Sequence, residues 1–129
     1  MRTALLAAVL AVATITPAFA DDAADLAAAK EAIAAAKLSP QSDLALWCGS
    51  AMTLVSQATK DSDAEKSKAA EDSAAAFFGA ASASLMADGV KQDDFAGLGN
   101  DYMVLASAQL VAQTEPPSHD TDECVVPAT

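Results

Sequence analysis

The chain has 129 residues, of which 18 are acidic and 7 basic, so its formal net charge is −11 at pH 7. Such a surface repels phosphate, so we expect neither nucleic acid nor anionic lipid among its partners, and the charge favours a basic protein or peptide. Alanine supplies much of the apolar fraction while aromatic residues make up only 5%. Helices can therefore pack closely, although each contact buries little area.

Residues 1–20 have the pattern of a cleavable secretory signal peptide. Arg2 is followed by an apolar run from Ala4 to Ile15, by Pro17 to Ala20 with its A-x-A end, and then by two aspartates. The run is short for a membrane span and no other stretch approaches one, so we expect no membrane insertion after cleavage. The sequence thus predicts a periplasmic or secreted protein.

A first helix is predicted from Asp21 or Asp22, which can cap it, to about Leu38, where the following Ser39-Pro40 ends it. It is strongly helical because it is rich in alanine, but it offers few large apolar side chains. We expect it to be the most loosely held helix, packing either within a monomer or across a homodimer. Its predicted inward face consists of Leu26, Ala29, Ile33 and Ala36.

The central helix is predicted from Pro40 to about Thr59, with Ser39 as its N-cap and proline at its first position. It carries the only tryptophan and the densest apolar pattern of the chain. Its apolar residues recur at steps of three and four, which indicates one face turned to a core: Leu44, Trp47, Ala51, Leu54 and Ala58. The remaining side, including Gly49 and Ser50, is small or polar. We therefore expect this helix to be central but not buried all round.

Two further helices are predicted in the rest of the chain. Ser62 to Glu65 matches a capping box, and the helix that follows should run from Asp63 to Ala87, with Asp88-Gly89 as its stop. Asp93 or Asp94 can cap the last helix, which must end before Glu115-Pro116-Pro117. Its predicted inward face consists of Phe95, Leu98, Tyr102, Leu105 and Ala106.

These elements predict an all-α protein, a small antiparallel bundle of about four helices over residues 21–115. A proline-containing acidic tail, predicted to be extended, follows over residues 116–129. Cys48 and Cys124 have no alternative partner within the chain, and an oxidising compartment would join them. Closing a loop of this length stabilises a fold by roughly 4 kcal/mol in the chain-entropy model. The bond would tie the tail to the bundle.

Trp47 to Ala51 reads W-C-G-S-A, which resembles part of the papain-type nucleophile motif but lacks its second cysteine and following aromatic residue. A thiolate enzyme would need an imidazole, and the only histidine is His119, which a disulfide through Cys124 would bring towards Cys48. A structural disulfide is the interpretation that we favour over catalysis. We therefore expect no catalytic residue and no enzymatic activity.

The tail stretch from His119 to Glu123 could hold zinc or a hard cation, but a solvated acidic loop is the simpler interpretation. We expect no bound metal and no cofactor. Aromatic side chains could instead line an interaction surface or a small apolar pocket between helices, although core packing is the expected fate of Trp47 and one of the adjacent phenylalanines. The candidates are Trp47, Phe77, Phe78, Phe95 and Tyr102.

A signal peptide, helices throughout, a tryptophan beside one cysteine and a second cysteine near the end resemble small disulfide-closed periplasmic proteins of Gram-negative bacteria. Acid-stress periplasmic chaperones are similar in layout, but they have W-T-C where this chain has Leu46-Trp47-Cys48, and their lysine-rich C-terminal segment is absent here. Many of these proteins have no assigned function, so the resemblance carries over no functional residue. From the sequence as a whole we expect a non-catalytic interaction protein of the inhibitor, immunity or envelope-stress chaperone type. A bundle that binds a small ligand, or an unrecognised enzyme, is the alternative.

Overall fold

The computed structural model describes residues 23–125, so the signal-peptide prediction and the proposed caps Asp21 and Asp22 lie outside the described residues. Four α-helices make up most of this part, which contains no strand: a first helix over residues 23–36, α2 (Pro40–Thr59), α3 (Ala64–Ala87) and α4 (Phe95–Leu110). Two short 3-10 turns accompany them, η1 (Gln92–Asp94) and η2 (Thr121–Glu123). The all-α prediction is confirmed.

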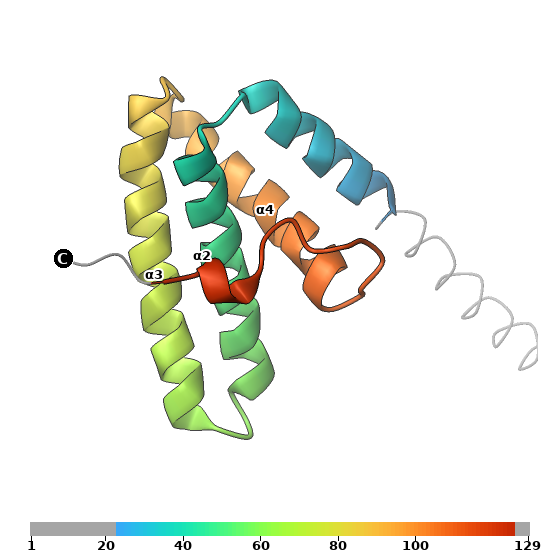
Figure 1. Ribbon diagram of the computed structural model, residues 1–129, viewed down its shortest axis with the longest axis vertical. Helices are drawn as coiled ribbons and strands as arrows, with labels where there is room; N and C mark the ends of the chain where they lie inside the picture. Colours follow the sequence, from blue (N-terminus) through green and yellow to red (C-terminus); the bar gives the residue numbers. More distant parts are fainter. Residues whose placement is uncertain (1–22, 126–129) are drawn as a thin grey trace, which may run out of the picture.

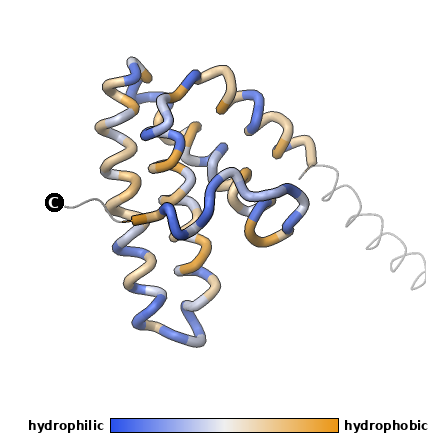
Figure 2. Tube along the Cα trace, viewed as in Figure 1, coloured by the Kyte–Doolittle hydropathy of each residue, from blue (hydrophilic) through white to orange (hydrophobic). Residues whose placement is uncertain are grey.

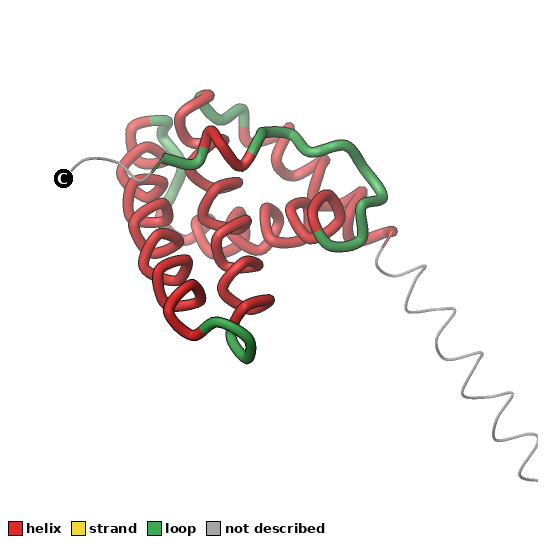
Figure 3. Tube along the Cα trace, turned by 60° about the horizontal axis from the view of Figure 1, so that its bottom comes forward, coloured by secondary structure: helices red, strands yellow, loops and turns green. Residues whose placement is uncertain are grey.

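The helices α2 and α3 lie side by side as an antiparallel hairpin, and α4 starts behind the first part of α2 and runs diagonally away from it, on the side opposite α3 (Figure 1). The first helix runs up to the start of α2 from the side on which α4 lies, and the chain after α4 returns across α2 (Figures 1 and 3). The turn that joins α2 to α3 is strongly hydrophilic (Figure 2). Within residues 23–125, no helix is both long enough and apolar enough to cross a membrane.

Helix α2 starts as predicted, because the Ser39 side chain accepts a hydrogen bond from the backbone N–H of Ser42 and Pro40 occupies the first turn. The predicted start of α3 is wrong in detail. Asp63, and not Ser62, is the N-cap, and its carboxylate accepts a hydrogen bond from the N–H of Lys66. The Ser62 N–H instead bonds to the carbonyl of Thr59 in the turn after α2.

The helix ends follow backbone geometry that the sequence only partly indicates. The first helix stops at residue 36, two residues before the predicted end, because Lys37 adopts a positive φ of 50°. Gly89, with a φ of 85°, ends α3 as predicted. Asp94 occupies the N-cap position of α4, as predicted, but neither Asp93 nor Asp94, which lie in η1, makes a side-chain capping hydrogen bond to the helix.

Helix α2 is the centre of the core. Trp47, Cys48 and Ala51 are fully buried, and Gly49 and Ser50, on the predicted small and polar side, are buried as well. The prediction that α2 is not buried all round is therefore wrong in its middle turns, because α3, α4 and the C-terminal segment surround it. A Cβ on Gly49 would lie 2.9 Å from Phe78 Cε1, so glycine here permits the close approach of α3.

A carboxylate at the end of α3 binds the start of α2. Asp88 Oδ2 accepts hydrogen bonds from the Ser42 hydroxyl at 2.6 Å, the Ser39 backbone N–H at 3.1 Å and the Ser39 hydroxyl at 3.0 Å. The hydrogen bond from Ser42, followed by that from the Ser39 backbone, lowers the pKa of Asp88 below its usual range. The negative charge also lies at the positive end of the α2 dipole.

We expect Asp88→Asn to lower the urea midpoint of unfolding at pH 7. Because the pKa of Asp88 is lower in the folded protein, its charge stabilises the fold above the pKa of the unfolded chain, near 4, and this contribution disappears as pH falls through the folded pKa. The difference between variant and wild type should therefore shrink in acid. Asp61→Asn, which removes an exposed carboxylate from the turn between α2 and α3, is the matched control. An equal loss at every pH would contradict this prediction.

The structure joins Cys48 to Cys124, residues 76 positions apart in sequence, with a Cα–Cα distance of 5.4 Å. We expect the variant with both cysteines replaced by alanine to lose roughly 2–4 kcal/mol of unfolding free energy, measured by urea denaturation followed through tryptophan fluorescence. Reduction of the wild-type bond, which keeps both sulfur atoms, controls for lost packing. A midpoint that neither treatment changes would refute the stabilising role of the bond.

Candidate functional site

The C-terminal segment, residues 111–125, folds back across α2 and α4 (Figure 1). Besides the disulfide, polar contacts fasten it along its length, to the first helix as well as to α2 and α4. The fastening pairs are Glu115 with Lys30, Ser118 with Gln109, His119 with Asp43, and Cys124 with Cys48. The predicted attachment of the tail through Cys124 is confirmed, but the segment also contains the turn η2 and is not simply extended.

Asp43, in the first turn of α2, binds groups from two other parts of the chain. The Tyr102 hydroxyl on α4 donates to its Oδ1 atom, and His119 Nε2 lies 2.7 Å from its Oδ2 atom. The histidine contact requires a proton on Nε2, because a carboxylate can only accept. With both oxygens engaged, the Asp43 side chain still keeps 37% of its surface exposed. The carboxylate is thus held in a fixed orientation while it remains accessible.

His119 is enclosed on three sides. Its Nδ1 atom lies 3.6 Å from a carboxylate oxygen of Glu123, on the opposite side of the ring from Asp43. Its ring packs against that of Trp47 in a T-shaped arrangement, with a centroid distance of 5.5 Å and an interplanar angle of 63°. The expectation that the disulfide brings His119 towards Cys48 agrees with this contact to the neighbouring tryptophan.

A buried polar network lies beside this cluster. The Trp47 indole N–H donates to Gln109 Oε1 at 2.8 Å, and the same oxygen accepts from the backbone N–H of Ser118 at 3.0 Å. The Gln109 amide in turn donates to the Ser118 hydroxyl at 2.8 Å. Gln109 is 4% exposed, so these bonds satisfy a buried amide and fix the segment against α4.

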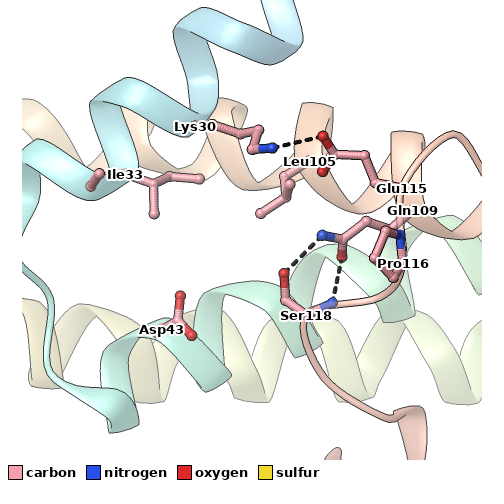
Figure 4. Close-up of a pocket in the computed structure, with 9 residues that line it drawn as sticks. Lys30, Ile33, Asp43, Leu105, Gln109, Glu115, Pro116 and Ser118 are labelled. Atoms are coloured by element: carbon pink, nitrogen blue, oxygen red, sulfur yellow. Dashed lines mark hydrogen bonds and ion pairs between the residues drawn. The ribbon is translucent and has the colours of Figure 1, made fainter.

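An open pocket of about 450 Å³ lies between the first helix, α4 and the C-terminal segment, with the start of α2 at one end (Figure 4). Its apolar walls are Ile33, Ala34, Leu105 and Pro116. Its polar lining consists of Lys30, Asp43, Gln109, Glu115 and Ser118. The Lys30 ammonium is 2.7 Å from a carboxylate oxygen of Glu115, so this pair links the first helix to the segment at the side of the pocket.

The predicted aromatic candidates occupy the core and its margin. Trp47, Phe77 and Tyr102 are buried, whereas Phe78 and Phe95 are half-buried and pack against the core. Of the two adjacent phenylalanines, Phe77 therefore lies in the core and Phe78 at its margin. None of the five lines the pocket, whose walls come from aliphatic and polar side chains.

The sequence pointed to Ile33, Leu105 and His119, but it did not single out the polar residues that line the pocket. Asp43 could have been found, because it lies one helical turn before Trp47 and therefore on the same face of α2. Gln109 is also in register with the apolar face of α4, seven residues after Tyr102. Nothing in the local sequence marks Lys30, Glu115 or Ser118, since their roles depend on where the segment returns.

The structure also places the other sequence candidates for chemistry. Cys48 is bonded to Cys124 and so offers no thiolate. Asp120 and Glu123 form a capping box around η2: the Asp120 carboxylate binds backbone N–H groups of the turn, and Glu123 Oε2 accepts from the Asp120 N–H at 2.8 Å. Among residues 23–125, no group of three or more histidine, cysteine or acidic side chains is arranged to hold a metal ion.

The fold and the site define an all-α protein, closed by one disulfide, with an open pocket beside its C-terminal segment. No protein-family model matches the chain, and comparison with curated proteins and with solved structures finds no match.

Tyr102 is the only tyrosine, so its ionisation can be followed by absorbance at 295 nm. Burial raises its pKa above the ordinary value near 10, and the hydrogen bond to Asp43 and the charge of that carboxylate raise it further. We expect the phenolate to appear only as alkali unfolds the protein. The stability that the protonated phenol provides is complete below pH 10 and is lost as pH rises towards the folded pKa.

Tyr102→Phe is the control that separates this contribution from lysine titration in the same pH range. It should lower stability at pH 8 and flatten the fall in urea midpoint between pH 9 and 11. Phenolate absorbance near pH 10 with the fold still intact by circular dichroism would show that the Asp43–Tyr102 contact is absent in solution.

Proposed function

We propose that this chain is an exported, non-catalytic binding protein, periplasmic or secreted, whose partner is a basic protein or peptide. The observation that carries this proposal is the pocket beside the C-terminal segment, at which one accessible carboxylate, Asp43, is fixed by two donors. A charged group that is already held in one orientation beside apolar walls favours recognition, because little side-chain conformational entropy is lost when a partner binds. The excess of 18 acidic over 7 basic residues selects a partner of positive charge.

The state of the reactive side chains supports binding rather than catalysis. Both ring nitrogens of His119 face carboxylates, so neither is directed at the pocket. Tyr102 is buried and its raised pKa keeps its proton in place, while Cys48 is in the disulfide. A general base must lie within hydrogen-bonding reach of a substrate proton, and these groups instead bind one another.

The disulfide supports the compartment in this proposal, because such bonds persist mainly in oxidising environments. It also keeps the wall formed by Pro116 and Ser118 in position, since it anchors the same segment a few residues further on.

A second candidate is a protein that binds a small molecule. The pocket volume of about 450 Å³ favours it, because ligand pockets commonly measure 300–1,000 Å³. The aromatic lining that the sequence suggested for such a pocket is not found around this one, whose walls are aliphatic.

The proposal is tested by immobilising the oxidised protein, produced from the full chain and exported by a Gram-negative host, and exposing it to envelope extract from the organism that encodes it. We expect one basic protein to be captured at neutral pH, to bind directly once purified, and to bind more weakly as salt is raised. The Cys48→Ala/Cys124→Ala variant should lose most of this binding.

Two outcomes would overturn this function. Capture of many unrelated proteins in acid alone would indicate a chaperone of the envelope-stress type in place of a protein with one basic partner. No direct binding by any purified candidate would refute a protein partner.

A further inference from the structure

The pocket has apolar walls and one negative charge, on Asp43, that the other lining residues do not neutralise. Lys30 is the single cation among the lining residues, and it is bound to Glu115 at 2.7 Å. Asp43 contacts Tyr102, which stays neutral, and His119, which lies between the carboxylates of Asp43 and Glu123, so that one imidazole charge could offset only one of these two negative charges. The exposed part of Asp43 therefore presents a negative charge to the pocket.

We propose that this pocket binds the side chain of a lysine or arginine residue from the basic partner, with its ammonium or guanidinium group at Asp43. This inference rests on the proposed function and names the contact through which the partner binds. The apolar stem of the side chain lies between Ile33 and Ala34 of the first helix and Leu105 and Pro116 opposite. Lysine and arginine carry three or four methylene groups that bury well while the charged end stays polar.

Hydrogen bonding at the Asp43 end supports a cationic ligand. Each Asp43 oxygen accepts one bond in the free protein, and a carboxylate can accept about four, so an N–H donor is accommodated without displacing Tyr102 or His119. The Ser118 hydroxyl oxygen accepts from Gln109 and can accept once more. An anionic ligand would be repelled by the two lining carboxylates, Asp43 and Glu115.

The charged residues around the pocket also favour a cationic ligand. Glu123 faces His119 from the far side of the ring, and Asp120 and Asp122 lie exposed on the same turn of the C-terminal segment. These groups add to the negative potential that attracts a basic side chain and repels an acidic one.

The test uses the full-length, oxidised protein labelled with ¹⁵N and titrated with lysine or arginine blocked at both ends. The amide signals of Ile33, Leu105 and Ser118 should shift with saturable binding. Blocked norleucine, which keeps the stem without the charge, and blocked glutamate should cause no saturable shift. Asp43→Asn should weaken lysine binding at least roughly tenfold, the loss expected for one hydrogen bond to a charged group.

Two further variants keep the test independent of folding. Ala34→Phe places a ring in the pocket from an exposed position of the first helix, and it should abolish binding while Trp47 fluorescence and circular dichroism stay native. Asp61→Asn, at the far end of the 20-residue α2 and so about 30 Å away, should bind like wild type.

The outcomes separate this inference from the proposed function. Equal binding of blocked lysine and blocked norleucine, or no effect of Asp43→Asn and Ala34→Phe, would overturn the side-chain site. If a purified basic partner then still bound both variants like wild type, the proposed function would stand without this pocket. Binding of putrescine at least tenfold tighter than blocked lysine would instead assign the pocket to free amines and overturn the peptide source.

Discussion

The Cys48–Cys124 bond fixes the C-terminal segment, residues 111–125, to the most buried turn of α2. Residues 111–125 have few apolar side chains of their own, so a covalent link replaces the burial that would otherwise hold them. With the C-terminal segment fixed in this way, His119 contacts Asp43, and Ser118 forms hydrogen bonds with Gln109. The wall of the pocket therefore depends on a bond that lies outside it.

The core shows how a chain rich in alanine builds a fold. Small residues let α3 approach α2 closely, as Gly49 does against Phe78, but they supply little buried area. Polar contacts at the ends of the hairpin complement this packing: Asp88 holds the start of α2, and the Ser67 hydroxyl donates to the carbonyl of Ser56 at 2.8 Å near its other end. The Ser50 hydroxyl, fully buried, has no hydrogen-bond partner among the described residues.

Asp43 connects the stability of the fold to the proposed binding. Its contact with Tyr102 joins α2 to α4, and its contact with His119 joins both to the C-terminal segment. A carboxylate in this position would be costly if it were fully buried without partners, but its partial exposure leaves it solvated. The same exposure makes Asp43 available to a cation from a partner. The contacts that stabilise the fold therefore do not prevent the proposed binding.

The sequence by itself determined the helices, most of their limits and the pairing of the two cysteines, because periodicity, proline and glycine act locally and two cysteines allow one pair. It also marked Ala29, Trp47, Tyr102 and Leu105 as inward residues. Only the tertiary structure decided that Gly49 and Ser50 are buried, and that Asp43, Gln109 and Glu115 meet around one pocket. These positions depend on where the returning segment and the crossing helices lie, and contacts between residues distant in sequence leave no local pattern from which to predict them.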